Sequence, residues 1–268
     1  MQDPQVTLVE PDRVLKTACS AGSNRLALRS YKSRLDGTGS RAPGGKQQHT
    51  HAGSRALLQH DAASVPGQTV PTGVARSGGP VQGTFTAAIA VLDSGVGPHQ
   101  DLNILSGYSC ISNDGNTDDD SLEGHGTHVS GSAAAMDNDF GVIGIAPGAP
   151  IVPVKVADRQ GSASISSVLC GIEWVLQNKA AAVINLSLDG AATSADKVPC
   201  DGTDATSALH QAICGAINQG VIVTASAGND ANLTALHIPA VFPEVMSAGS
   251  LTDYNGKAGG GAHAITCG

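Results

Sequence analysis

Three residues far apart in the chain are of the types that hydroxyl-based nucleophilic catalysis requires. Asp93 ends the apolar run TAAIAVLD, His125 lies within LEGHGTHVSG, and Asn229 ends VIVTASAGN. Such catalysis needs a base for the nucleophile's proton, a carboxylate that orients the base, and a hydrogen-bond donor for the oxyanion. Each residue alone has an ordinary structural explanation, as a cap, a packed histidine or a turn residue. Together the three predict one catalytic site.

Apolar runs and helical patterns alternate from about residue 67 onward. The predicted strands are 86–93, 149–158, 181–188 and 221–229, and the predicted helices are 162–178 and 205–220. This alternation predicts an α/β fold, with a parallel sheet and helices on both of its faces. Because ligand sites collect at the carboxyl ends of such strands, one edge should carry Asp93, Asp158, the segment 187–189 and Asn229.

The composition fits one large α/β domain and excludes several partners. The chain has 268 residues, of which 41% are hydrophobic, 3% are aromatic and 34 are glycine, which favours a tightly packed core of small aliphatic side chains. Residues 77–268 contain 5 basic and 18 acidic side chains, which argues against a nucleic-acid partner. No apolar run approaches the roughly 18 residues of a membrane span, so we expect no membrane partner.

The chain contains six cysteines. Cys200 and Cys214 flank a short insertion-like stretch and could pair, whereas Cys170 lies in a helical pattern and is predicted to be a buried thiol. The sequence has no CxxC spacing, which argues against a zinc site.

Three of these stretches resemble, in the right order, motifs of the subtilisin-like serine proteases (subtilases, peptidase S8 family). VLDSGVGPHQDL is similar to the aspartate motif, GHGTHVSG to the histidine motif and TASAGN to the oxyanion segment. The resemblance runs from about Gln68 to Ser250 and implies a three-layer αβα fold with a mainly parallel sheet. It implies a serine endopeptidase acting on extended polypeptides, with Asp93 as triad acid, His125 as base and Asn229 as oxyanion donor. By the same match, His128 faces the helix packing.

Two further stretches, KVADRQGSASISSVLCGIEW and VINLSLDG, resemble the family's substrate-flanking strands. The resemblance implies that substrate lies extended as an added strand, between Gly161, Ser162 and Ala163 on one side and Ser187, Leu188 and Asp189 on the other. Asp189 stands where the family usually has a small residue. It could favour a basic side chain in the primary pocket, but a solvated charge on the rim is the preferred interpretation. The stretch IPAVFPEVMSAGS resembles the region behind that pocket, where Pro239 would be cis.

The resemblance also implies a structural Ca2+ site. The matching side-chain ligands are Gln68, Asp101 and Asn138, and the matching backbone carbonyls belong to Met136, Phe140 and Val142. A hard cation takes about six to eight oxygen ligands, and a bent loop can supply several of them together. The alternative is an ordinary turn with a solvated Asp101.

The N-terminal region predicts three zones. VTLVEPDRV is similar to the last strand of the inhibitory pro-domain of many subtilases, so residues 1–16 are expected to be the end of that pro-domain, containing one short strand. Residues 17–66 are expected to be a low-complexity flexible linker, and residues 67–268 an incomplete catalytic domain that diverges after about residue 250. The resemblance implies self-cleavage in or beyond the linker, inhibition by the chain's own pro-domain, and a secreted, monomeric protein.

The family's nucleophile lies in a Gly-Thr-Ser-Met-Ala motif, which this sequence does not contain. We therefore expect a C-terminally truncated fold that cannot acylate and that exposes apolar surface, and Ser207 is not a convincing substitute. A non-catalytic peptide-binding pseudoprotease is the main alternative, although it does not explain why the acid, the base and the oxyanion donor all remain. A nucleotide-binding α/β domain is disfavoured because no GxGxxG or GxxxxGK[ST] motif follows a strand.

Overall fold

The computed structural model describes residues 12–17, 67–112, 115–193, 196, 200 and 207–250. In this part of the chain a six-stranded sheet has the order β10-β8-β6-β2-β4-β3, and all its neighbouring strands pair in parallel. Its strands are β2 (Ile89–Asp93), β3 (Tyr108–Ser109), β4 (Ile151–Lys155), β6 (Val183–Leu186), β8 (Ile222–Ser226) and β10 (Met246–Ala248). The four predicted strands are thus confirmed, each shorter than expected, and the predicted parallel sheet is correct.

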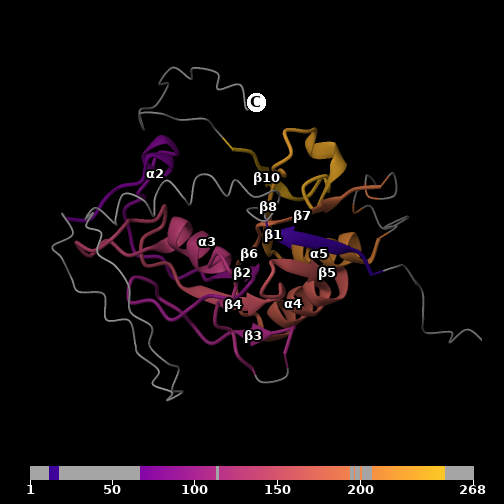
Figure 1. The fold of residues 1–268 in the computed structure, drawn as a ribbon, viewed down its shortest axis with the longest axis horizontal. Coiled ribbons are helices and arrows are strands. Elements are labelled where there is room, and N and C mark those ends of the chain that lie inside the picture. The colour runs from indigo at the N-terminus through magenta and orange to yellow at the C-terminus, as the bar shows by residue number, and fades with distance from the viewer. Residues whose placement is uncertain are drawn as a thin grey trace, which may run out of the picture. The chain divides into compact units, whose positions relative to one another are not determined.

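Helices cover both faces of this sheet, as Figure 1 shows. Strand β2 illustrates why, because Ala90 and Leu92 pack into one hydrophobic cluster while Val91, between them, packs into another. The first cluster contains buried side chains of α4 (Ile165–Asn178) and α5 (Ala208–Asn218). The second contains Ala134 of α3 (His125–Ala134). The result is the three-layer αβα arrangement that the sequence predicts.

The predicted helix 162–178 begins later than expected. Residues Ser162–Ser164 form strand β5 instead, and Ser164 is the N-cap of α4, where its hydroxyl accepts a hydrogen bond from the Ser167 N–H at 3.1 Å. The predicted strand 181–188 is likewise divided, because β6 ends at Leu186 and β7 (Leu188–Ala191) begins a different sheet. Both differences have the same cause, which is that β5 and β7 pair outside the main sheet.

This second sheet is antiparallel and has the order β5-β1-β7-β9. Strand β1 (Val14–Thr17) comes from the N-terminal segment, and β9 (His237–Ile238) follows the 3₁₀ helix η2 (Thr234–Leu236). In Figure 1, β1 is the indigo arrow between β5 and β7. The N-terminal segment thus contains a strand, but it begins at Val14, where VTLVEPDRV ends, and extends to Thr17. Residues 1–11, most of the predicted linker and residues 251–268 lie outside the described part of the chain.

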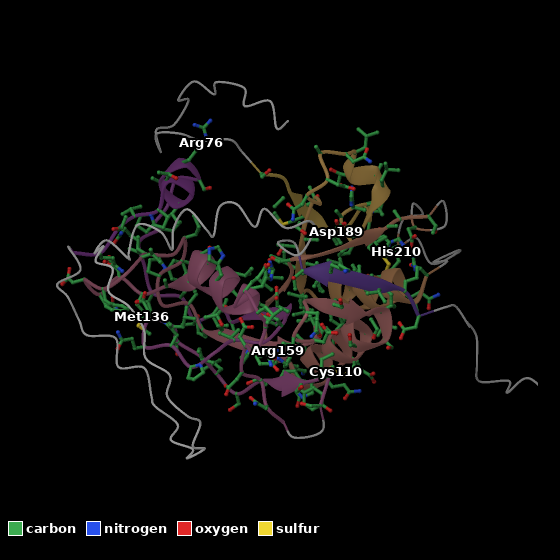
Figure 2. All side chains as sticks on the ribbon, viewed as in Figure 1. Arg76, Cys110, Met136, Arg159, Asp189 and His210 are labelled. Atoms are coloured by element: carbon green, nitrogen blue, oxygen red, sulfur yellow. A yellow bond between two sulfur atoms is a disulfide. The ribbon has the colours of Figure 1, made fainter. Side chains whose placement is uncertain are left out.

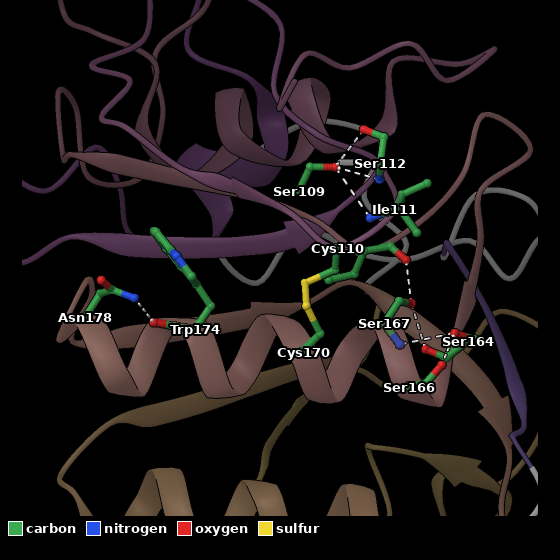
Figure 3. The surroundings of a disulfide bond; sticks show 11 residues. Ser109, Cys110, Ile111, Ser112, Ser164, Ser166, Ser167, Cys170, Trp174 and Asn178 are labelled. Carbon is green, nitrogen blue, oxygen red and sulfur yellow. Dashed lines mark hydrogen bonds between the residues drawn. A yellow bond between two sulfur atoms is a disulfide. The ribbon is translucent and has the colours of Figure 1, made fainter. Parts of the chain in front are cut away.

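Two disulfides join the described segments. The predicted pair Cys200–Cys214 is confirmed. The prediction that Cys170 is a free thiol is wrong, because it pairs with Cys110 across 60 residues of sequence. Figure 3 shows the reason: Cys110 directly follows β3, and this strand end lies against the side of α4 that carries Cys170. One turn further along α4, the Trp174 ring stacks on Tyr108 of β3 with centroids 5.4 Å apart.

A short helix, α2 (Thr72–Arg76), completes the described elements. None of the helices in the described ranges is long and apolar enough to cross a membrane.

Candidate active site

A buried carboxylate–imidazole pair joins the end of β2 to the start of α3. His125 Nδ1 lies 2.8 Å from Asp93 Oδ1, and the two residues are 4% and 0% exposed. The backbone N–H of Ser94 donates to the same carboxylate oxygen at 2.7 Å, which fixes its position. With Nδ1 held by Asp93, the other ring nitrogen of His125 is the one available to a reacting group.

Glycine is required where α3 meets the loop after β2. A Cβ atom on Gly126 would lie 2.1 Å from the carbonyl oxygen of Gly95, well inside van der Waals contact. The Gly126 N–H instead donates to the Ser94 hydroxyl at 3.1 Å. The glycine after His125 therefore allows the helix to start close enough for the histidine to reach Asp93.

Asp119, in the acidic run before the histidine motif, holds the first turn of α3 in place. Asp119 accepts hydrogen bonds from the backbone N–H and the hydroxyl of Thr127 at 2.9 and 2.8 Å. It also accepts from the hydroxyls of Ser121 at 2.6 Å and Ser94 at 3.0 Å. This anchoring of the first turn of α3 is not predictable from the motif, although the position of the run directly before it is a visible signal.

A buried lysine supports the loop after β2 and the acidic run. The Lys155 ammonium at the end of β4 donates to the backbone carbonyls of Ser94 at 2.6 Å and Asp118 at 3.0 Å. It also forms an ion pair with Asp120. Lys155 is 6% exposed, and its charge is matched by these acceptors.

The surroundings of His125 favour its protonated form. Burial alone would lower the pKa, but the hydrogen bond and charge of Asp93, together with the charges of Asp119 and Glu123, outweigh it and raise the pKa of His125. For Asp119, burial acts to raise the pKa, but the hydrogen bonds from Ser121, Thr127 and Ser94 outweigh it, so the pKa lies below its usual value. The ionised Asp119 thus adds to the negative charge that raises the pKa of His125.

Strand β1 lies between the two segments that the sequence predicts to flank a substrate. In register, Leu15 is opposite Ala163, Lys16 is opposite Ser162 and Asp189, and Thr17 is opposite Leu188. The Thr17 N–H donates to the carbonyl of Gly161 at 2.8 Å. The sixth predicted residue, Ser187, directly precedes β7 and accepts from the Asn185 side chain at 2.9 Å. The chain's own backbone thus lies where an extended peptide is expected.

Side chains secure the N-terminal end of this strand. The Asp12 carboxylate accepts from the backbone N–H of Ser166 at 3.0 Å and from its hydroxyl at 2.6 Å. The Arg13 guanidinium makes two hydrogen bonds to Asp196, at 3.0 and 3.2 Å. Leu15 is only 1% exposed, whereas Val14 is 59% exposed, so the strand buries alternate side chains.

Asp189 is not the solvated charge that the sequence analysis prefers. Its Oδ1 lies 2.6 Å from His237 Nδ1, and its side chain is 19% exposed, so it is not a solvated charge on the rim. The carboxylate is bound to His237, which leaves it less able to attract a basic substrate side chain. His237 Nε2 is also 3.1 Å from Asp230, an ion-pair distance without hydrogen-bond geometry.

The same histidine packs on the segment that carries Asn229. A Cβ atom on Gly228, which has a φ of 96°, would lie 2.8 Å from the His237 ring. His237 therefore links β7 to the loop after β8. Sequence reasoning missed it, because a single histidine in LHIP gives no signal of its partners.

Asn229 is exposed and follows β8 at the carboxyl edge of the sheet, the edge at which β2 ends with Asp93. The fold thus places the predicted acid and the predicted oxyanion donor on one edge. The peptide bond before Pro239 is cis, as the resemblance implies.

His128 does not face the helix packing as predicted. The buried residues of α3 are His125, Gly126, Ser130 and Ala134, and His128 is exposed. Around the helix, His128 lies on the side opposite to Ser130, so it is outside the face that the buried residues define. Ser207 is the N-cap of α5, where its hydroxyl accepts from the His210 N–H at 3.3 Å.

The six predicted calcium ligands lie together. The side-chain amide of Gln68 donates to the carbonyl of Met136 and, at 3.2 and 3.0 Å, to those of Phe140 and Val142. The Asn138 side chain donates to Asp101 Oδ1 at 2.9 Å, and its backbone N–H donates to Gln68 Oε1 at 3.1 Å. An amide group has only two N–H hydrogens, so the convergence of carbonyl oxygens from 136, 140 and 142 exceeds what Gln68 can satisfy. This oxygen cluster fits a hard cation. Figure 2 shows Met136 on the opposite side of the molecule from Asp189.

Comparisons with known proteins agree with this geometry. The family model described as "Subtilase family" matches residues 86–262. The chain is 40% identical over 167 residues to Minor extracellular protease Epr of Bacillus subtilis, which covers 62% of this chain and 24% of Epr. It is 37% identical over 205 residues to a thermostable alkaline protease of Halalkalibacterium halodurans, which covers 75% of this chain and 52% of that protein. It is 37% identical over 196 residues to Subtilisin Savinase of Lederbergia lenta, with coverage of 71% and 67%.

Among solved structures, a cold adapted subtilisin-like serine proteinase matches with a TM-score of 0.52 and 33% identity, over 63% of this chain and 56% of that chain. The chain thus spans about a quarter of Epr's length, about half that of the alkaline protease and two thirds that of Savinase. The family match, the similarity to subtilisins and the shared fold agree, and the chain belongs to the subtilase family of serine peptidases.

Proposed function

We propose that this chain provides the acid, the base and the peptide-binding cleft of a subtilisin-type serine endopeptidase. The observation that carries the proposal is β1, an extended segment of the chain paired on both sides between β5 and β7. The buried Asp93–His125 pair provides the general base, with its hydrogen bond of 2.8 Å. Family membership supports a peptidase that acts on polypeptides.

In the proposed reaction His125 takes the proton of the nucleophile hydroxyl on its Nε2 atom. Asp93 holds the ring by Nδ1 and stabilises the imidazolium that forms. The Asn229 side chain donates a hydrogen bond to the oxyanion, a contribution typically worth about 10²–10³ in rate. The raised pKa of His125 fits this task, because it makes the ring a stronger base.

The proposed substrate binds as an extra strand. Main-chain hydrogen bonds to Gly161 and to β5 and β7 would hold it, as they hold β1. A strand that already fills the cleft excludes other peptides, so we propose that the segment around β1 acts as an inhibitory pro-segment. Removal by cleavage after β1 would then free the cleft.

The nucleophile is the part of the triad that this sequence does not show. It contains no Gly-Thr-Ser-Met-Ala stretch, and Ser207 is committed as a helix cap. We therefore propose that the 268-residue chain alone does not acylate, and that it binds other peptides only once β1 has left the cleft. A pseudoprotease that holds peptides without cleaving them is the second candidate, because the pairing of β1 with β5 and β7 supports binding of an extended segment but does not bear on turnover.

Labelling with a fluorophosphonate separates these functions. The natural protein, isolated from its source, should be labelled on one serine, and mass spectrometry should place this serine outside residues 1–268. His125→Ala in the same protein should abolish labelling, and circular dichroism should check that the variant keeps its fold. Stoichiometric labelling of the 268-residue chain would contradict the proposal, and a natural protein that binds peptides but is never labelled would be the pseudoprotease.

We further propose that the oxygen cluster around Gln68 and Asp101 binds Ca2+. The fit rests on carbonyl oxygens of Phe140 and Val142 that converge within 3.2 Å of one Gln68 atom, beside the Asp101 carboxylate. When bound, the ion would hold the loop 136–142 in place and take no part in the chemistry. The two disulfides support secretion, because such bonds persist in oxidising compartments.

A further inference from the structure

A second cluster of reactive side chains lies outside the active site. Cys200, His210, Cys214 and Glu244 each present one ligand atom, and these atoms all lie within 4.8 Å of one another. Cys200 precedes α5, His210 and Cys214 lie on α5, and Glu244 lies in the turn before β10. Figure 2 marks its position by His210, on the same side of the molecule as Asp189. The proposed peptidase function does not use any of these side chains.

The cluster is held in place by its surroundings. His210 is fully buried, and its ring stacks on Phe242 with centroids 4.4 Å apart and planes 2° from parallel. The Cys200 N–H donates to Glu244 Oε1 at 2.6 Å, which orients the carboxylate. His210 and Cys214 are four residues apart on one helix and therefore project from the same side. These contacts hold His210 and Glu244 in place before any ion binds, and the helix places Cys214 on the same side.

The two distances from His210 Nε2 match those of a tetrahedral zinc centre, and the two sulfurs would separate once the disulfide is reduced. Zn–S and Zn–N bonds of about 2.3 and 2.0 Å at tetrahedral angles place sulfur about 3.6 Å from nitrogen, and nitrogen about 3.3 Å from oxygen. The observed distances from His210 Nε2 are 3.7 Å to Cys200 Sγ and 3.0 Å to Glu244 Oε2. Two thiolates, an imidazole and a carboxylate form a donor set suited to zinc. Because the ligands are buried or half-buried, such a site would be closed and structural.

We propose that the chain binds one Zn2+ through Cys200, His210, Cys214 and Glu244 whenever the two cysteines are thiols. In the structure these cysteines form a disulfide, so the zinc-bound form and the disulfide form exclude each other. A newly made chain reaches the zinc form without any redox step, because Zn2+ displaces the two thiol protons. The oxidised chain reaches it after a tertiary phosphine and water convert the disulfide to two thiols, with the phosphine oxidised to its oxide.

The spacing of these ligands explains why the sequence argues against zinc. Zinc ligands are usually recognised as CxxC pairs, whereas here the cysteines are 14 residues apart and Glu244 lies 44 residues after Cys200. Only the fold brings the turn before β10 against the start of α5. In either state the cluster ties these two segments together.

The experiment uses the full chain, reduced with a phosphine under anaerobic conditions and titrated with Zn2+ against a chromophoric competitor. The reduced wild type and the reduced C110S/C170S variant should each bind one tight equivalent. The reduced C200S/C214S variant and the oxidised wild type should bind none. With Co2+ in place of zinc, the wild type should show the strong visible bands of a tetrahedral site and a near-ultraviolet thiolate charge-transfer band.

Glu244→Gln distinguishes a folded site from loose thiols. It keeps the shape of the side chain, and it should weaken zinc binding by at least about tenfold and alter the Co2+ bands. Thiols in an unfolded chain would not respond to this change. The proposal fails if reduced wild type binds no more zinc than C200S/C214S, if E244Q binds as tightly as wild type, or if Co2+ shows no thiolate band.

Discussion

At His125, the protein uses more than the one carboxylate that touches the ring. Asp93 makes the contact, but Asp119 and Glu123 also raise the pKa, and burial opposes all three. Asp119 additionally secures the first turn of α3 through Thr127. Asp119, which precedes the histidine motif, therefore affects both the protonation and the position of His125.

Asp119→Asn is expected to lower the pKa of His125, because it removes a negative charge that favours the imidazolium. The measurement is an NMR titration of the His125 ring in the purified chain. Asp118→Asn removes the same charge one residue away, where it is not among the main causes of the shift, and should change the His125 pKa much less. Equal shifts in the two variants would show that only the net charge matters.

The raised pKa of His125 also has a consequence for stability. A histidine whose folded pKa exceeds its unfolded value, about 6.5, stabilises the fold below that pH, and this contribution disappears as the pH rises through the folded pKa. The Asp119→Asn variant should therefore lose less stability than the wild type over this pH range.

The residues of the candidate active site differ in how well the sequence predicts their positions. Asp93, His125 and Asn229 are predictable because each stands at the end of an element inside a distinctive motif. The pairing of Asp189 with His237 is not, because the two residues lie on strands that become neighbours only when the second sheet forms.

At the scale of elements, α3 needs glycine at one of its positions and not at another. Gly126 meets the backbone of the loop after β2, whereas a Cβ atom on Gly131 would have nothing within 4 Å. Both residues belong to the same helix. The start of the helix is therefore fixed by close packing, and its middle is not.

Gly126→Ala should lower the free energy of unfolding by about 3 kcal/mol, the upper part of the range for overpacked sites. Gly131→Ala should raise it by about 0.5–1 kcal/mol, because alanine favours the helix. Urea unfolding monitored by circular dichroism measures both variants. A similar effect of the two substitutions would mean that the contact with Gly95 relaxes freely.

An ion pair that is lost at low pH holds strand β1. The Arg13 guanidinium lies beside Asp196; burial acts to raise the pKa of this carboxyl, but the hydrogen bonds from Arg13 and Thr193 outweigh it and lower the pKa to about 2. Because the folded pKa is depressed, the stabilisation is present above about pH 4, the unfolded value, and is lost as the pH falls toward 2.

Asp196→Asn should therefore destabilise the chain by about 1–2 kcal/mol at pH 7, a figure reduced for the partial exposure of Arg13. The difference from wild type should vanish between pH 4 and pH 2 in unfolding measurements across this range. Asp158→Asn, at a carboxylate without a basic partner among its described contacts, is the control. A difference that persists at pH 2 would show that packing, not charge, holds the segment.

Local sequence patterns predict the strands of the main sheet but not the strand β5. Strands of the main sheet are apolar on both faces, so β2, β4, β6 and β8 are visible in the sequence. The split of the predicted helix into β5 and α4 is not visible, because Ser162–Ser164 becomes a strand only through pairing with β1.

At the scale of the whole molecule, distant segments are joined by a disulfide and by the oxygen cluster. Cys110–Cys170 joins the end of β3 to α4, and Gln68 meets the loop 136–142 about 70 residues later. The resemblance to the family predicts the second link. The first escapes prediction, because a helical pattern does not reveal which strand end lies beside it.

Calcium should raise the unfolding temperature of the chain, and a chelator should reverse the effect, because the proposed ion would bind the folded loop and not the unfolded chain. At a concentration about 100 times the dissociation constant, the expected gain is about 2.7 kcal/mol. Asp101→Asn should remove most of this gain, and Asp137→Asn, at an exposed neighbour in the same loop, should not. Differential scanning calorimetry with and without calcium tests this, and a calcium effect unchanged by Asp101→Asn would place the ion elsewhere.

The pleat of β1 limits what the cleft can distinguish. Leu15 and Thr17 are turned into the protein, while Val14 and Lys16 are turned outward. A peptide bound in the same way would have only every second side chain in contact with the protein, and the side chains between them would be free to vary. Sequence tolerance at the cleft would therefore have a period of two, so a randomised peptide library should show selection and indifference in strict alternation.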